Sequence, residues 1–396
     1  MHERPLRIAL LTHSVNPRGG VVHTLELGRA LHDSGHAVTV IAPAMAGQRF
    51  FRELPHAVRL VPVGPAPREL AEMIGQRIPA FVAHLRGLLQ HQPFDVLHAH
   101  DGIGGNALAD LAEAGDIPGF VRTVHHLDDF ADARIAAWQH RAVAAASQLF
   151  CVSQTWCDTL RRDFGRSAAL VPNGVDLQRY TRTADTRDAA LSQRLGLRSG
   201  GPRVLLVGGI EARKNSVRVL QAFLQLRAAV RGAQLIVAGG ASLLDHGAAA
   251  AEFSATLAAA GITPGPAQDV VVTGTLPDDE MPALFRAASV LAMPSLAEGF
   301  GLVVLEALAC GTPVVVTQQP PFTEYLGGSV AAGHAVYCDP FDTGSIARAL
   351  AQAAEPARRV ALAGAVPPVC LQHGWAASAE RHARLYRAAL SEPTPA

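Results

Sequence analysis

Two glutamates, Glu298 and Glu306, flank a Gly-Phe-Gly turn and have seven residues between them. Glycines in such a turn let the backbone approach a ligand closely. A helix that begins near Leu302 would direct free N–H groups and the positive end of its dipole toward an anion. Glu306 lies about one turn into that helix, within reach of polar groups further along the same ligand. This stretch therefore predicts a binding site for a phosphate-bearing ligand.

Apolar runs at 289–295 and 313–317 flank this stretch and are typical of buried parallel strands. The alternation of strand and helix patterns continues along the chain and predicts a doubly wound α/β architecture. A polar, poorly periodic segment at 178–202 lies near the midpoint and predicts a domain boundary. We therefore expect one domain over 1–178 and a second over 200–374.

The composition is typical of a globular protein of a reducing, cytoplasmic compartment. The 396 residues suffice for two packed cores, and 49% of them are hydrophobic. Lys+Arg and Asp+Glu are equal at 34 each, which argues against nucleic-acid binding through a basic surface. No run reaches the roughly 18 apolar residues of a membrane span, so we expect peripheral membrane association at most. The cysteines are odd in number and mostly set in apolar runs, which predicts small core residues: Cys151, Cys157, Cys310, Cys338 and Cys370.

The stretch from Glu298 to Glu306, with a strand on either side, resembles the donor-site signature of the GT4 family of retaining glycosyltransferases. The resemblance covers nearly the whole chain. It implies the GT-B fold, in which two Rossmann-like domains face each other across a cleft. In that family the second glutamate holds the ribose hydroxyls of a sugar nucleotide, and the first contacts the transferred sugar. The resemblance implies those roles for Glu306 and Glu298, and sugar and phosphate contacts for the backbone of Phe300, Gly301 and Leu302.

A second loop, from Gly209 to Asn215, resembles the family's G-R-x-x-x-x-K-G element, whose Arg and Lys neutralise the donor diphosphate. Lys214 matches the lysine of that element. Gly209 stands at the arginine position, which is a departure from the family pattern. Arg213 is the neighbouring residue that could supply the missing charge, although its position requires a different side-chain direction.

Gly19 and Gly20 follow the first strand and resemble the glycine loop that GT4 enzymes place near the donor phosphates and the acceptor. By themselves they are equally typical of a turn before a helix. The loop lacks the G-x-G-x-x-G of a dinucleotide-binding turn, which disfavours a nicotinamide-dependent dehydrogenase. Gly274 follows a later strand and matches by position the backbone groups with which the family recognises the nucleotide base.

Histidines and aspartates gather in a polar turn that follows the strand near 121–124. His125 matches the T-x-H element through which GT4 enzymes present a histidine to the donor sugar, with His126 as the alternative. Asp128 or Asp129 could orient the imidazole or meet the acceptor hydroxyl.

His98 and His100 share one face of another predicted strand. A metal site is conceivable there, but no cysteine or carboxylate cluster completes it, and we expect no metal. The resemblance instead implies an H-x-H-D segment at the domain cleft.

We therefore expect retaining transfer of a sugar from a nucleotide-diphospho-sugar to a hydroxyl of a small-molecule, glycan or lipid-linked acceptor. The donor is expected to be UDP-, GDP- or ADP-linked, with UDP favoured, and to need no cofactor. Since no carboxylate stands out as a covalent nucleophile, the family's front-face attack is adopted, with the leaving phosphate as base. A helix at 375–391 is expected to complete the first domain. One alternative is a non-catalytic sugar-nucleotide-binding protein, which the absence of the family's arginine at Gly209 suggests. The other is a GT-B phosphorylase or epimerase.

Overall fold

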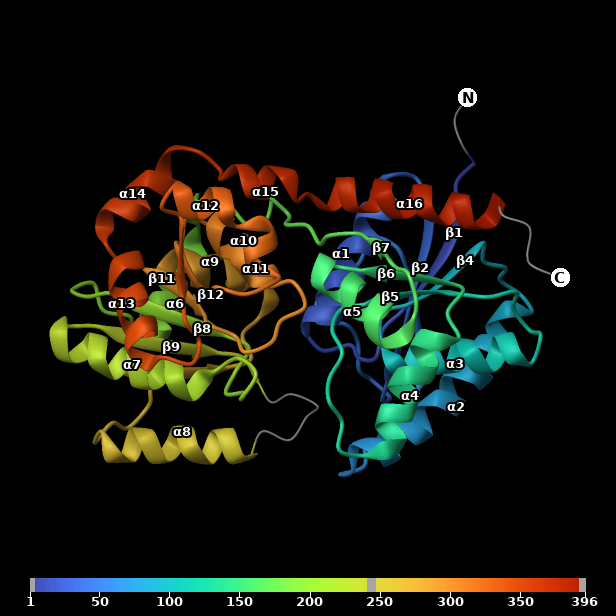
Figure 1. Ribbon diagram of the computed structural model, residues 1–396, viewed down its shortest axis with the longest axis horizontal. Helices are drawn as coiled ribbons and strands as arrows, with labels where there is room; N and C mark the ends of the chain where they lie inside the picture. Colours follow the sequence, from blue (N-terminus) through green and yellow to red (C-terminus); the bar gives the residue numbers. More distant parts are fainter. Residues whose placement is uncertain (1–3, 241–246, 392–396) are drawn as a thin grey trace. The chain divides into compact units, whose positions relative to one another are not determined.

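The computed structural model describes residues 4–240 and 247–391, and the chain divides into two compact units (Figure 1). Unit 1 consists of the described residues up to Gly174 together with the helix that starts at Trp375, and unit 2 is Val175–Gly374. Each unit contains one parallel sheet with helices between its strands. The expected fold class of two doubly wound Rossmann-like units is therefore confirmed.

Unit 1 alternates strands and helices along the chain. Its elements are β1 (Arg7–Leu11), α1 (Gly19–Asp33), β2 (Ala37–Ala44), β3 (Ala57–Pro62), α2 (Leu70–Leu89), β4 (Val96–Ala99), α3 (Gly102–Glu113), β5 (Val121–Val124), α4 (Ala133–Ala144), β6 (Gln148–Cys151), α5 (Gln154–Phe164), β7 (Ala169–Leu170) and α16 (Trp375–Ser391). The strands pair in parallel in the order β3-β2-β1-β4-β5-β6-β7. The order reverses between β1 and β4, so the carboxyl ends of these two strands form the edge where such sheets bind ligands.

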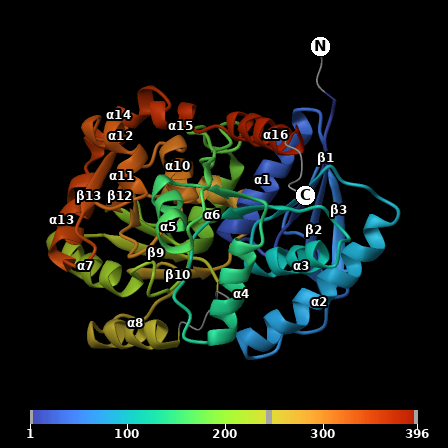
Figure 2. The same ribbon diagram turned by 45° about the vertical axis from the view of Figure 1, so that its right-hand side comes forward.

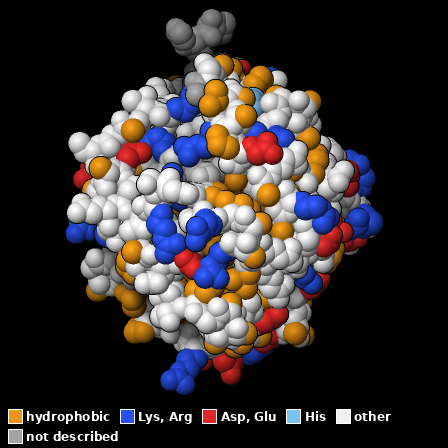
Figure 3. Space-filling model, turned by 90° about the vertical axis from the view of Figure 1, so that its left-hand side faces the viewer, with side chains coloured by type: hydrophobic (Ala, Val, Ile, Leu, Met, Phe, Trp, Pro, Cys, Tyr) orange, Lys and Arg blue, Asp and Glu red, His pale blue; other side chains and the backbone are white. Residues whose placement is uncertain are grey.

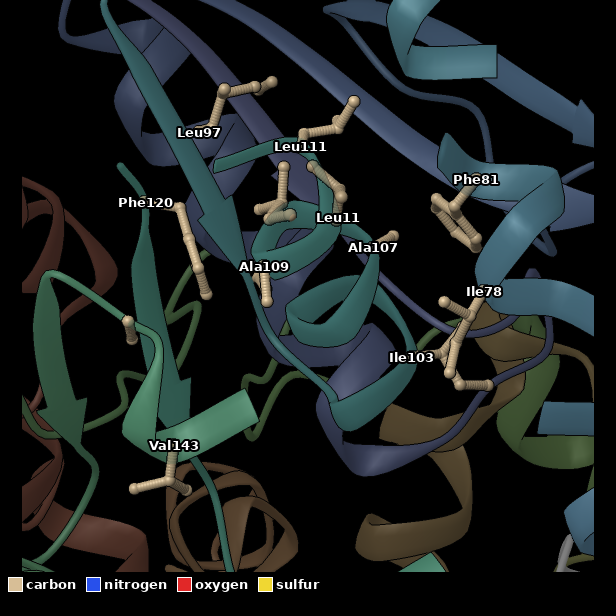
Figure 4. Close-up of a cluster of buried hydrophobic side chains, with 14 of the residues drawn as sticks. Leu11, Ile78, Phe81, Leu97, Ile103, Ala107, Ala109, Leu111, Phe120 and Val143 are labelled. Carbon is tan, nitrogen blue, oxygen red and sulfur yellow. The ribbon is translucent and has the colours of Figure 1, made fainter. Parts of the chain in front are cut away.

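A core of buried apolar side chains joins the sheet of unit 1 to helices α2 and α3. Figure 4 shows side chains from both helices and from β1 and β4 gathered in one interior. The apolar face of α2 extends to the first turn of the helix through the buried Ala71 and Met73. The apolar contacts of α2 and α3 with the sheet therefore support the carboxyl ends of β1 and β4, where the polar loops begin.

Unit 2 is built in the same way on a six-stranded parallel sheet of order β10-β9-β8-β11-β12-β13. Its elements are α6 (Thr186–Leu195), β8 (Arg203–Val207), α7 (Ser216–Ala229), β9 (Gln234–Ala238), α8 (Gly247–Ala259), β10 (Val270–Gly274), the 3₁₀ turn η1 (Asp278–Glu280), α9 (Met281–Ala287), β11 (Val290–Met293), α10 (Leu302–Ala309), β12 (Val314–Thr317), α11 (Phe322–Tyr325), α12 (Gly327–Ala331), β13 (Ala335–Cys338), α13 (Thr343–Ala353), α14 (Pro356–Gly364) and α15 (Pro368–Gln372). The strand order reverses between β8 and β11.

The segment 178–202, expected to be a polar boundary, contains helix α6 and belongs to unit 2. Asp185 and Asp188 form a capping box at its start, and Gly196 ends it in the left-handed conformation with φ 62°. Of the ten residues of this helix, two leucines are buried. The helical spacing of apolar residues is therefore weak in this segment, and its capping residues are the main sequence indication of a helix.

Helix α16 lies beside α1 within unit 1 (Figures 1 and 2). Its buried residues recur at helical spacing: Trp375, Ser378, Ala379, His382, Ala383 and Tyr386. The Tyr386 hydroxyl lies 2.6 Å from Nδ1 of His98 on β4. The last helix of the chain therefore supplies part of the interior of the first unit.

The surface and the cysteines agree with the composition. On the face drawn in Figure 3, basic side chains stand among acidic and apolar ones. All five cysteines lie within the described residues, none forms a disulfide, and all are buried, as their apolar settings predicted. Among the described residues, no helix has both the length and the apolar character that crossing a bilayer requires.

Candidate functional site

Unit 2 places Lys214 and Glu298 at the edge where its strand order reverses. Lys214 lies in the loop that follows β8, and Glu298 lies in the loop that follows β11. Ligands of open parallel sheets bind at the carboxyl ends of strands at such a reversal. The fold thus brings together two predicted site residues that are 84 positions apart in the sequence.

Lys214, Arg213 and Glu298 form a compact charged cluster. Nζ of Lys214 donates to Oε2 of Glu298 at 2.5 Å, and the Arg213 guanidinium lies 3.5 Å from the same oxygen. Arg213 also donates to the carbonyl of Ala297 at 3.1 Å. The side chains of Lys214 and Glu298 are only 11% and 12% exposed. Although they are sequence neighbours, Arg213 and Lys214 thus direct their charges to one carboxylate.

Burial and charge act in opposite directions on this cluster. Burial alone raises the pKa of Glu298, but the charges of Lys214 and Arg213, the Lys214 hydrogen bond and the Gly299 amide bring it down to about 2. The pKa of Lys214 is lowered, because burial and the like charge of Arg213 outweigh the attraction of Glu298. For Glu298 the attraction of two cations outweighs burial. For Lys214 burial and the repulsion of Arg213 outweigh the attraction of one carboxylate, so both pKa values are lowered.

Helix α10 begins directly after Gly301, so Leu302 is its first residue. Gly301 has φ 88°, and a Cβ at this position would lie 2.6 Å from Cε1 of Phe322. Glycine is therefore needed both for the backbone conformation and for the close approach. No side chain of the described residues caps this end of the helix. Such an end presents backbone N–H groups and a positive dipole to an anion.

Phe300 and Glu306 are both buried at this end of unit 2. The Phe300 ring stacks on Tyr325 with 4.9 Å between ring centroids, and the Tyr325 hydroxyl donates to the Phe300 carbonyl at 2.8 Å. The side chain and carbonyl of Phe300 are thus used in packing, which leaves its N–H for the expected ligand contact. Glu306 lies in the second turn of α10, as expected. Gly274 ends β10 with φ 67° and has open space where a Cβ would be.

The departure at Gly209 has a structural cause. Gly209 has φ 80°, and a Cβ there would lie 2.9 Å from the carbonyl oxygen of Gly240. Gly208 and Gly209 both donate their N–H groups to the Ala238 carbonyl of the neighbouring strand. An arginine at position 209 is therefore incompatible with this loop conformation.

Unit 1 places His125 immediately after β5 and half-buried, with His126 exposed beside it. Burial, followed by the nearby imidazole of His126, lowers the pKa of His125 to about 3. Oδ2 of Asp128 lies 3.1 Å from Nε2 of His126. Asp128 therefore orients the second of the two predicted imidazoles.

The glycine loop differs from the expectation in its conformation. Gly19 and Gly20 are the first two residues of α1, and neither has a positive φ. They therefore open the helix itself. A Cβ at Gly20 would lie 3.7 Å from Cδ2 of His125, which places the start of α1 beside this histidine.

A cluster of buried histidines in unit 1 was not predicted. His23 of α1 and His100 after β4 lie with His125, and their ring centroids are 4.5 to 5.8 Å apart. His98 and His382 lie next to this group and are also buried. The pattern of His98 and His100 on one strand was visible in the sequence. The contributions of α1 and α16 depend on tertiary packing alone.

Two family models match the chain, one for each half. The model described as Glycosyltransferase Family 4 matches residues 17–179, and the model described as Glycosyl transferases group 1 matches residues 188–359. A relative from Salinispora arenicola, named D-inositol 3-phosphate glycosyltransferase, is 30% identical over 375 residues. That alignment covers 83% of this chain and 79% of the relative.

Solved structures of similar fold accompany these sequence matches. Sucrose-phosphate synthase from Thermosynechococcus elongatus aligns with a TM-score of 0.78 at 21% identity, over 98% of this chain and 99% of that one. Anabaena HepE, solved in complex with UDP-glucose, aligns with a TM-score of 0.76 at 19% identity, over 97% of this chain and 100% of that one. Both likenesses support the two-unit α/β fold.

Proposed function

Because the chain belongs to the glycosyltransferases that the family 4 and group 1 models describe, we propose that it transfers a sugar from a nucleotide-diphospho-sugar to an acceptor hydroxyl with retention of anomeric configuration. One observation carries the proposal. Lys214 and Arg213 converge on Glu298 at the strand reversal of unit 2, in the loop that leads into the N-terminus of α10. Two cations beside a helix N-terminus suit a diphosphate leaving group.

The leaving group needs most of the electrostatic stabilisation. As the bond between the anomeric carbon and the diphosphate oxygen breaks, negative charge develops on the diphosphate and positive charge on the sugar. An ammonium group has three N–H donors, so Lys214 can hold Glu298 and a phosphate oxygen together. Arg213 and the backbone N–H groups of Phe300, Gly301 and Leu302 supply further donors.

The sugar and the nucleotide are assigned to the remaining residues. Glu298 holds hydroxyls of the transferred sugar, and Glu306 holds the ribose hydroxyls. The backbone at Gly274 meets the base. His125 of unit 1 keeps its proposed contact with the donor sugar, with Asp128 orienting the neighbouring imidazole. Gly19 and Gly20, at the start of α1, keep their proposed place near the phosphates and the acceptor.

The bond changes balance without a covalent enzyme intermediate. The acceptor oxygen bonds to the anomeric carbon on the face that the diphosphate leaves. The hydroxyl proton passes to an oxygen of the departing phosphate, which acts as the base. No step in this scheme requires a cofactor.

A UDP-sugar is the first donor to test, because the structural neighbour HepE was solved with UDP-glucose. The first acceptor to test is D-inositol 3-phosphate, after the name of the relative. Two arginines of unit 1, Arg18 before α1 and Arg77 on α2, favour a phosphate-bearing acceptor. Burial, and then the charges of Arg18 and Arg77, lower the pKa of His13 to about 3, so two cations lie near the end of β1.

The test is product analysis with the full chain, UDP-, GDP- and ADP-glucose, and D-inositol 3-phosphate. We expect acceptor-dependent release of one nucleoside diphosphate and, by NMR, a product with the anomeric configuration of the donor. Glu306→Gln should lower kcat/KM about 10- to 100-fold, the value of a hydrogen bond to a charged group. The exposed Glu324→Gln serves as control. Inversion of configuration would contradict retention, and donor binding without turnover of any acceptor would favour a non-catalytic binding protein.

A further inference from the structure

The three histidines His23, His100 and His125 come from three different elements of unit 1 and face one another. His23 lies on α1, His100 follows β4 and His125 follows β5. One ring nitrogen of each histidine lies within 4.8 Å of the corresponding nitrogens of the other two. This convergence occurs at the sheet edge where the strand order reverses between β1 and β4.

Polar atoms of this group are buried without a hydrogen-bond partner among the described residues. They are Nε2 of His23, both ring nitrogens of His100 and Nε2 of His125. His23 is 0% exposed and His100 is 4% exposed. A buried polar atom without a partner costs about 1–3 kcal/mol. Four such atoms gathered in one group indicate a missing ligand.

Asn173 selects the form of His23 that can bind a metal. Its side-chain oxygen Oδ1 lies 2.8 Å from Nδ1 of His23. An amide oxygen only accepts, so Nδ1 carries the proton and Nε2 keeps its lone pair. In metal sites the ligating histidine is commonly fixed in this way by a hydrogen bond from its other nitrogen.

We propose that His23, His100 and His125 bind one divalent transition-metal ion, with Zn²⁺ as the ion that best fits the site. Three imidazoles suit Zn²⁺, which takes three protein ligands and leaves a fourth position for water or a hydroxyl group. Imidazole ligates such ions in its neutral form.

Zinc binding requires a modest contraction of the cluster. Zn–N bonds of about 2.0 Å in a tetrahedral site place the nitrogens about 3.3 Å apart. The distances between the three ligating nitrogens, now at most 4.8 Å, therefore have to shorten by about 1.5 Å at most.

The test is isothermal titration of the full chain, free of any histidine tag and dialysed against a chelator, with ZnCl₂. A parallel titration with CoCl₂ follows the visible absorption of tetrahedral Co²⁺. We expect one ion per chain. His100→Ala should abolish binding, and Asn173→Leu should weaken it about 10- to 100-fold, as loss of an outer hydrogen bond does.

His32→Ala is the matched control, because His32 lies on the same helix as His23 but is exposed. It should bind the ion as the native chain does, and circular dichroism verifies that each variant is folded. Absence of stoichiometric binding in the native chain, or equal binding by His100→Ala and His32→Ala, would overturn the proposal. His125 serves in both proposals, but the titration contains no donor or acceptor, so failure of metal binding is distinguishable from failure of the proposed sugar transfer.

Discussion

At the scale of single residues, the choice of lysine at position 214 is informative. The sequence has 34 Lys and Arg residues, and Lys214 is its only lysine. An ammonium is a compact point charge with three donors, whereas a guanidinium is a planar fork. The Lys214 ammonium is almost buried and lies 2.5 Å from Oε2 of Glu298. Its three donors point in different directions, so it can bind a carboxylate and a phosphate at once, whereas the donors of a guanidinium lie in one plane.

We predict that Lys214→Met raises the Kd for the bound nucleoside diphosphate about 10- to 100-fold, since a charged hydrogen bond to phosphate contributes about 1.5–3 kcal/mol. Isothermal titration measures the change, and the exposed Arg231→Met is the control for loss of one positive charge. An amine-specific reagent gives a second readout, because Lys214 carries the only side-chain amine. The nucleotide should protect it. Unchanged affinity in Lys214→Met would remove this residue from the donor site.

Glu298 makes the folding stability of unit 2 depend on pH. Its pKa in the folded chain, about 2, lies below its ordinary value of 4.5. The stabilisation from its ionised form is therefore complete above pH 4.5 and is lost as the pH falls from 4.5 toward 2. The shift corresponds to about 3 kcal/mol at most. We predict that the native chain loses about 1.4 kcal/mol of stability per pH unit over this range through Glu298, and that Glu298→Gln lacks this component.

The measurement is hydrogen exchange of β8 and β11 between pH 5.5 and 3.5, because Trp138, Trp156 and Trp375 all lie in unit 1 and their fluorescence does not report on unit 2. Glu252→Gln, a change at an exposed glutamate on α8, should retain the native pH dependence. A Glu298→Gln profile parallel to the native one would show that Glu298 is not held ionised by Lys214 and Arg213.

At the scale of elements, the loop after β8 fixes which residue can supply the second positive charge. Gly209 adopts a left-handed conformation against the Gly240 carbonyl, so position 209 has no room for a side chain. Arg213 lies four residues further on and reaches Glu298 from the loop's other end. The loop therefore keeps two cations at the site although it lacks the arginine of the family pattern.

We predict that Gly209→Arg, which restores that pattern, destabilises unit 2 by about 1–3 kcal/mol, the range for a strained backbone position. It should not tighten nucleotide binding. Urea unfolding followed by circular dichroism and isothermal titration measure the two effects. Gly200→Arg is the control, since position 200 has open space and no positive φ. A stable Gly209→Arg chain with tighter nucleotide binding would contradict the assignment of Arg213.

The sequence predicted the central elements well because buried parallel strands are short apolar runs between polar loops. The strands β11 and β12 lie within the predicted runs, and the helix α10 begins at the predicted Leu302. Helix α6 was missed because two of its ten residues are buried. The histidine cluster was missed because His23 joins it from another element, and no spacing in the sequence records such an encounter.

At the scale of the whole molecule, the proposed nucleotide site lies in unit 2 and the histidine cluster lies in unit 1. Each unit has its own sheet, and each sheet has its own reversal of strand order. A ligand that binds one unit stabilises that unit by RT ln(1 + L/Kd), where L is the free ligand concentration. A probe resolved along the sequence can therefore separate the two assignments in a single experiment.

The measurement that tests the central claim most directly is hydrogen exchange of the full chain, read by mass spectrometry, with UDP, GDP or ADP at saturating concentration. We predict that one of these slows exchange in the loop 208–215 and in the segment 298–309, and that Lys214→Met loses this protection. Protection confined to unit 1, or no protection by any of the three, would contradict a nucleotide-sugar donor site in unit 2.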